Sequence, residues 1–156
     1  MAELPPIRVW TKDEMRPRIA YYTDLTVNYD GLPDSPLPEC IRGLANVIGF
    51  KPPKDEGAKI SSPVGSSAAR SAAIEISEGF NLGYVKAKPG RGPLMHNHDT
   101  NETFIPMTGT WRCSWNEEAE LQHVDVGPLD CVSFPPGVAR RFENVTKADA
   151  DTEHIL

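Results

Sequence analysis

The stretch PGRGPLMHNHDTNETFIPMTG, residues 89–109, carries the pattern that decides the fold of this chain. His96 and His98 stand two positions apart, and Glu102 follows four positions after the second histidine. On a strand, residues two apart share one face, and the polar DTN segment before Glu102 predicts a turn. A hairpin of this kind brings two imidazoles and a carboxylate to one point, a ligand set that suits Fe, Mn, Ni or Zn.

The chain from residue 72 onward predicts an all-β domain. Its short apolar segments end at turn residues and recur about every ten residues, which is typical of a β-sandwich or barrel. In the segment TWRCSWN, alternation places Trp111, Cys113 and Trp115 on one face and Arg112 on the other. The final residues EHIL are expected to form a last strand that pairs back onto the sheet.

Residues 1–66 are expected to be an N-terminal extension, and residues 67–156 the barrel. The extension is irregular and holds too little apolar surface for an independent core, so we expect it to wrap the barrel or to lie at a subunit contact. Four of its segments carry local signals: LPPIRVW predicts an edge strand, TKDEMRPRI a capped helical turn ended by Pro17, CIRGLANVIGF a strand or short helix, and KPPKDEGAKISSPVGSS a long loop.

Composition excludes several classes of function. With 156 residues the chain fits one domain, and its net charge of −6 argues against a nucleic-acid partner, because phosphate binding needs a basic face. No apolar run approaches the roughly 20 residues that a membrane span needs, and the N-terminus does not resemble a secretory signal. The three cysteines fit no disulfide framework, so we expect a cytoplasmic protein with reduced thiols.

The spacing around the two histidines resembles the first motif of the cupin superfamily. Gly90, His96, His98, Glu102 and Gly109 match that motif, G-x5-H-x-H-x3,4-E-x6-G, at every fixed position. The resemblance covers roughly residues 72–156 and implies a double-stranded β-helix, the jelly-roll barrel of small single-domain cupins. It also implies a divalent metal ion, Fe, Mn, Ni or Zn, at His96, His98 and Glu102.

The second cupin motif, G-x5-P-x-G-x2-H-x3-N, resembles LDCVSFPPGVARRFEN with two departures. Pro135, Gly137 and Asn144 match, but Leu129 replaces the leading glycine and Arg140 replaces the fourth metal-binding histidine. Arginine has no lone pair to offer a metal. By strand parity, Arg140 is expected on the interior face with Phe142 and Asn144.

Three interpretations of Arg140 stay open at this point. In the first, His96, His98 and Glu102 hold a metal while Arg140 grips an anionic substrate in bidentate fashion. In the second, Arg140 pairs with Glu102 and no metal binds, since a fixed cation within about 5 Å of a dication is repelled. In the third, Arg140 turns to solvent and is structural.

The expected function follows from these residues. We expect a metal-dependent cupin that acts on a small, acidic organic molecule with dioxygenase- or isomerase-type chemistry, or alternatively a metal-free binding or sensing module that holds a small anion through Arg140. Glu102 and Arg140 are the candidate catalytic residues. Candidate substrate contacts are Arg140, Phe104, Trp111 and Phe142, although such aromatic residues also fill cores. A homodimer is expected, because sheet edges need covering; His123, between the motifs, is expected at the surface.

Overall fold

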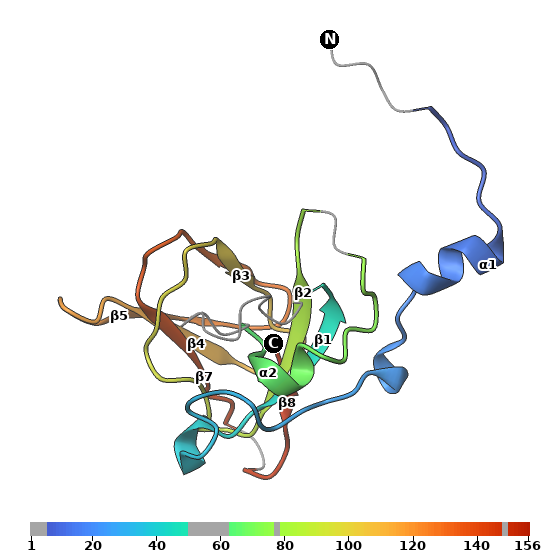
Figure 1. The fold of residues 1–156 in the computed structure, drawn as a ribbon. Coiled ribbons are helices and arrows are strands. Elements are labelled where there is room, and N and C mark those ends of the chain that lie inside the picture. Colours follow the sequence, from blue (N-terminus) through green and yellow to red (C-terminus); the bar gives the residue numbers. More distant parts are fainter. Residues whose placement is uncertain (1–5, 50–62, 77–78, 148–149) are drawn as a thin grey trace.

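The computed structural model describes residues 6–49, 63–76, 79–147 and 150–156, and the regular secondary structure of this part of the chain consists mainly of short strands (Figure 1). The strands are β1 (Gly43–Ile48), β2 (Leu82–Ala87), β3 (Glu102–Phe104), β4 (Trp111–Trp115), β5 (Gln122–Val126), β6 (Val132–Phe134), β7 (Arg140–Asn144) and β8 (His154–Ile155). The helical elements are α1 (Lys12–Met15), α2 (Gly65–Ala68) and the 3-10 turns η1 (Arg16–Arg18), η2 (Tyr22–Asp24) and η3 (Pro38–Cys40). The predicted all-β class is confirmed.

The strands form two three-stranded sheets and a two-stranded ribbon. The sheet orders are β1-β2-β8 and β5-β4-β7, and β3 pairs with β6. Every strand pair is antiparallel, and Figure 1 shows the two larger sheets on opposite sides of the barrel. The last strand, β8, pairs back onto β2, as the sequence predicts for EHIL.

The leading segment contributes a strand to the barrel. CIRGLANVIGF forms β1, whose pairing with β2 runs from Gly43 opposite Lys86 to Ile48 opposite Leu82. The sheet therefore includes residues from both sides of the boundary predicted at residue 66. We predicted that residues 1–66 do not fold as an independent domain, and this stays a prediction.

The other local predictions for the leading segment have mixed outcomes. TKDEMRPRI does begin a helix, with a capping box in which Thr11 and Glu14 bind each other's backbone N–H groups. The edge strand predicted for LPPIRVW is wrong for its described residues 6–10, which contain no strand and lie apart from the barrel without a strand beside them (Figure 1). Of the loop predicted at KPPKDEGAKISSPVGSS, residues 51–62 lie outside the described residues, and its end is wrong, because Gly65, Ser66 and Ser67 belong to α2.

The core lies between the sheets and is aromatic. Phe104, Trp111, Phe134 and Phe142 pack there with Cys113, and their rings meet edge to face at centroid distances between 5.0 and 6.1 Å. This packing fixes the interior faces of β3, β4, β6 and β7. Among the described helices none is long and apolar enough to cross a membrane.

Candidate metal centre

The backbone of β7 and of the turn before it positions the two histidines. His96 N donates a hydrogen bond to Arg140 O at 3.1 Å, and Arg140 N donates to His96 O at 2.9 Å, so His96 is paired directly with the first residue of β7. Gly137 N donates to His98 O at 2.8 Å. Glu102 opens β3. The histidine segment thus lies against the second motif, and Glu102 follows it in the sequence at the start of β3.

This arrangement brings His96, His98 and Glu102 together. One possible ligand atom from each side chain lies within 4.8 Å of those of the other two, and the imidazole centroids are 5.1 Å apart. Metal–ligand bonds of about 2.0–2.2 Å place the ligand atoms of one ion roughly 3–4 Å apart. Modest side-chain rotations therefore suffice for the three residues to bind one divalent ion.

His96 is held in one tautomer. Its Nδ1 lies 2.8 Å from Leu94 O, and because a carbonyl oxygen only accepts hydrogen bonds, Nδ1 must carry the proton. The neutral ring then has its lone pair on Nε2. Orientation of a metal-binding histidine by a backbone carbonyl is the usual outer-shell arrangement in metal sites.

His98 is favoured in its neutral form. Burial lowers the pKa of His98 from its ordinary value of 6.5, and the Arg140 guanidinium lowers this pKa further, against the opposing effect of Glu102. An imidazole must be unprotonated to bind a metal. The environment of His98 therefore keeps this ring available as a ligand at neutral pH.

Arg140 points into the same place and is almost completely buried, with 2% of its surface exposed. Its Nε donates to Glu102 Oε2 at 2.9 Å, Nη2 donates to the same oxygen, and Nη1 donates to His96 O at 3.1 Å. The exposed fractions along β7 alternate, with Arg140, Phe142 and Asn144 buried, as strand parity predicts. The third interpretation, a solvent-facing Arg140, is wrong.

The Arg140–Glu102 pair uses only one oxygen of the carboxylate. Both guanidinium nitrogens that contact Glu102 bind Oε2, whereas Oε1 faces His98, 3.8 Å from its Nδ1. Two imidazole nitrogens and this second carboxylate oxygen form a donor set that fits a divalent ion. The ion pair and a metal ligand role for Glu102 are therefore compatible, although the cation weakens any metal affinity.

The three predicted aromatic substrate contacts lie in the core. Phe104 follows Glu102 by two positions on β3, and Phe142 follows Arg140 by two positions on β7, so each shares its neighbour's interior face. Trp111 is one ring further away, packed on Phe142, and its Nε1 donates to Thr108 O at 3.0 Å. Phe104, Phe142 and Trp111 thus form an apolar surface, here called the aromatic floor, beside the polar cluster of His96, His98, Glu102 and Arg140.

Other candidate ligands lie elsewhere or are unsuited. His123 is exposed on β5, as predicted from the sequence. Cys113 is fully buried, and burial raises the pKa of its thiol to about 11, so the metal-binding thiolate is absent at neutral pH.

The backbone conformation and hydrogen bonds explain the structural roles of three motif positions. Gly109 has φ +74°, and a side chain there would collide with His154 and Thr146. Asn144 donates from Nδ2 to Ala87 O at 2.7 Å and accepts from Thr146 N at 3.0 Å. Leu129, at the glycine position of the second motif, has φ +72°, a conformation that favours glycine.

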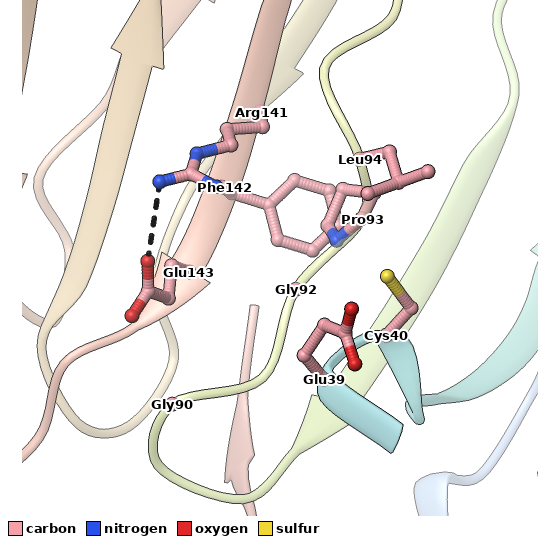
Figure 2. Close-up of a pocket in the computed structure, with 9 residues that line it drawn as sticks. All are labelled: Glu39, Cys40, Gly90, Gly92, Pro93, Leu94, Arg141, Phe142 and Glu143. Carbon is pink, nitrogen blue, oxygen red and sulfur yellow. Dashed lines mark ion pairs between the residues drawn. The ribbon is translucent and has the colours of Figure 1, made fainter. Parts of the chain in front are cut away.

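A hollow of about 250 Å³ lies outside this cluster, beside the loop that leads to His96 (Figure 2). Glu39 and Cys40 line one side of it, and Arg141 and Glu143, the outward residues of β7, line the other. Sequence reasoning did not identify this feature, because contact between residues some 50 positions apart leaves no local sequence signal.

Comparison with solved structures identifies the architecture. The chain is similar to an oxalate decarboxylase from Lactobacillus farciminis solved as a formate complex (TM-score 0.52, 12% identity, 85% of this chain and 30% of that chain). It is also similar to the CENP-C cupin domain of Drosophila melanogaster (0.50, 13%, 88% and 75%) and to the capsular polysaccharide assembling protein CapF of Staphylococcus aureus (0.50, 16%, 84% and 28%).

The chain therefore spans less than a third of the length of two of these proteins. No family model matches the sequence, and no curated protein matches it. The likeness concerns the fold, which is shared at very low identity. Together with the sheet order described above, it shows that this chain has the cupin fold, a jelly-roll β-barrel.

Proposed function

We propose that this protein is a metal-dependent cupin that acts on a small acidic organic molecule. The observation that carries the proposal is the convergence of His96, His98 and Glu102 within 4.8 Å. The Nδ1–H of His96 is used by Leu94 O, which leaves Nε2 with the lone pair, and the Oε1 atom of Glu102 is left unused by Arg140. Nε2 of His96 and Oε1 of Glu102 are therefore atoms that a divalent cation, Fe, Mn, Ni or Zn, would bind.

The charges of the cluster favour an anionic substrate. A divalent ion and the Arg140 guanidinium together carry three positive charges, and Glu102 supplies only one negative charge. A carboxylate that bridges metal and guanidinium would compensate this excess, and arginine binds carboxylates through two parallel hydrogen bonds. We therefore propose Arg140 as the residue that binds the acidic group.

The aromatic floor supplies the second part of the proposed substrate site. Phe104 and Phe142 lie on the same strand faces as Glu102 and Arg140, with Trp111 behind Phe142, so an apolar substrate body would pack against these rings. The metal, when bound, would act as a Lewis acid or activate dioxygen, for dioxygenase- or isomerase-type chemistry. Glu102 and Arg140 are the proposed catalytic residues, with Glu102 able to accept a proton when it leaves the metal.

A second candidate function is supported by the Arg140–Glu102 ion pair itself. Arg140 is buried at 2% exposure and donates two hydrogen bonds to Glu102 Oε2, as expected of a metal-free binding or sensing module. In that module, Arg140 would hold a small anion and the histidines would donate hydrogen bonds. Neighbours of the same fold include both an enzyme, the oxalate decarboxylase with formate, and the CENP-C cupin bound to CAL1.

Metal titration of protein purified without a histidine tag distinguishes the two candidates. Wild-type protein is stripped with a chelator and titrated with Fe²⁺, Mn²⁺, Ni²⁺ and Zn²⁺, and the bound metal is measured by elemental analysis after desalting. The proposal predicts close to one ion per chain, lost in the double variant His96→Gln, His98→Gln and kept in the control His123→Gln. Absence of binding with all four metals would favour the metal-free module.

We also propose a homodimer formed through the leading segment. Its helix α1 has a complete capping box but no buried residue, and isolated helices shorter than about 12 residues are marginal in water. Apolar side chains around it are exposed, including Ile7 at 97%, Val9 at 95% and Tyr21 at 65%. A contiguous exposed apolar surface of this kind marks an interaction site.

The dimer is tested by light scattering of the full chain. The triple variant Ile7→Ser, Val9→Ser, Tyr21→Ser should reduce the measured mass from two chains to one, because it removes the proposed apolar contact. The control Leu121→Ser changes a side chain that is exposed on the barrel and should leave the dimer intact. A wild-type mass of one chain at high protein concentration would contradict this part of the proposal.

A cytoplasmic location belongs to the same proposal. It is supported by the three cysteines, Cys40, Cys113 and Cys131, which are free thiols, as is usual in a reducing compartment.

A further inference from the structure

A buried ion pair in the leading segment is attached to the loop that precedes the histidines. The carboxylate of Asp34 accepts hydrogen bonds from Arg42 Nη2 and Nη1 at 3.1 and 3.2 Å. The same carboxylate accepts a third hydrogen bond, at 3.2 Å, from the backbone N–H of Leu94, sixty residues later. Only 7% of Arg42 and 12% of Asp34 are exposed, so water competes little for the ion pair itself.

Leu94 connects this ion pair to the metal centre. Its N–H is held by Asp34, and its carbonyl oxygen accepts the hydrogen bond from His96 Nδ1 at 2.8 Å. A shift of the Leu94 backbone would therefore lengthen the bond that fixes the tautomer and orientation of His96. The chain of contacts runs from Arg42 through Asp34 and Leu94 to the imidazole.

Packing alone does not hold this loop. The hollow of about 250 Å³ in Figure 2 lies against Pro93 and Leu94, so the loop has open space on one side. On the other side, Gly92 lies so close to the carbonyl oxygen of Phe142 that no side chain would fit. Between its backbone contacts with β7 at Arg91 and His96, the loop is held by hydrogen bonds to the leading segment, from Leu94 N to Asp34 and from Gly92 N to Glu39 O.

We infer that Asp34, itself held by Arg42, is a positioning residue for His96. It fixes Leu94 so that the carbonyl accepts from Nδ1 and the lone pair of Nε2 faces the metal centre. The inference deepens the proposed function and rests on it for the consequence in metal binding. The loss of an outer-shell partner typically weakens metal affinity by about 10- to 100-fold, and we expect this range on loss of Asp34.

The test uses two variants of the full chain and one matched control. Asp34→Ala removes the carboxylate that accepts from Leu94 N and pairs with Arg42, and the double variant Asp34→Ala, Arg42→Gln also removes the buried cation that would be left unpaired. Asp125→Ala is the control, because Asp125 forms a similar two-bond pair with Arg112 on the exposed outer face. Circular dichroism verifies folding of each variant.

Two readouts are measured. In metal-free protein, long-range ¹H–¹⁵N spectra report which imidazole nitrogen of His96 is protonated, a signature that loss of stability alone does not change in a folded protein. We expect Nδ1–H in wild type and control, and a mixture of tautomers in both Asp34 variants. Zn²⁺ affinity, measured by competition with a chelating dye, should weaken 10- to 100-fold in the same two variants.

The outcomes separate this inference from the proposed function. If the His96 tautomer changes in the Asp34 variants but the wild type binds no zinc, the positioning role of Asp34 is supported and the proposed metal function is contradicted. An unchanged tautomer in the folded Asp34 variants would overturn the inference. If both variants fail to fold, Arg42→Lys decides: it keeps the cation, reaches one carboxylate oxygen, and should shift the tautomer signal partway, whereas an unchanged signal would overturn the inference.

Discussion

Two arginine–carboxylate pairs of this barrel have the same chemistry and opposite surroundings. On the outer face, Arg112 Nε and Nη2 bind the two different oxygens of Asp125 at 2.7 and 2.8 Å, and both side chains are about 40% exposed. In the interior, Arg140 binds a single oxygen of Glu102 from a nearly sealed position. The outer pair occupies both carboxylate oxygens, whereas the inner pair leaves one oxygen facing the imidazole of His98.

This difference shows how burial changes the consequence of the same interaction. An exposed pair is screened by water and contributes little to stability. A buried guanidinium without its carboxylate costs much more, because its charge has no solvent to compensate it. The inner pair also has an unused oxygen, so it can neutralise Arg140 and still provide a ligand.

The largest expected effect is on stability, from removing one negative charge in each pair. Glu102→Gln should lower the free energy of unfolding by about 2–4 kcal/mol, because it leaves Arg140 buried and unpaired, while Asp125→Asn should cost less than about 1 kcal/mol. Urea unfolding of metal-free protein measures both values. Equal losses in the two variants would show that burial does not distinguish the pairs.

A smaller effect on the free energy of unfolding is expected at Leu129, where the second motif departs from the cupin pattern. Leu129 replaces the glycine of the second motif and has φ +72°, with 80% of its surface exposed. The left-handed conformation costs about 1–2 kcal/mol for a residue with a side chain, and glycine loses about 0.5–1 kcal/mol through backbone entropy.

Leu129→Gly should therefore raise the free energy of unfolding by about 0.5–1 kcal/mol, measured by the same urea titration. The matched control is Leu121→Gly, at another exposed position where φ is not positive, which should destabilise. Destabilisation by both changes would mean that Leu129 is not strained.

The smallest expected effect is on the pH dependence of the free energy of unfolding, which should differ between a histidine of the inner cluster and a histidine of the outer surface. Because the pKa of His98 is lowered by burial below its ordinary 6.5, the unfolded chain binds a proton at this residue before the native chain does. Stability then falls as pH drops below about 6.5 and levels off below the native pKa. The cause is that the unfolded state holds more protons in this window.

The measurement is urea unfolding with chelator between pH 7.5 and 5.0. His98→Gln should have a shallower loss of stability in this range than wild type, while His123→Gln, on the exposed strand β5, should retain the wild-type slope. A slope that His98→Gln leaves unchanged would contradict the lowered pKa.

Much of the barrel was predictable because its signals are local. The segment RRFEN alternates, and the structure buries Arg140, Phe142 and Asn144 as parity requires. The spacing of His96, His98 and Glu102 likewise needs only a turn to bring the three residues together. Period-two alternation and turn residues act over a few positions, so a single sequence contains them.

The parts that sequence reasoning missed depend on distant contacts. LPPIRVW has the composition of a strand, but its described residues have no strand to pair with and stay irregular. Asp34 meets Leu94 across sixty residues, and neither residue carries a local pattern that indicates the contact. The conformation of Leu129 also became visible only in the structure, because its sequence position suggested a departure from the motif and not strain.

The measurement that tests the central claim most directly is the metal affinity of Arg140→His compared with wild type. The claim is that the barrel directs His96, His98, Glu102 and Arg140 to one interior place, where Arg140 replaces a ligand and repels the ion. Arg140→His adds an imidazole and removes a cation, so Zn²⁺ affinity measured by dye competition should rise at least about tenfold. An affinity equal to or weaker than that of wild type, in folded protein, would contradict the account.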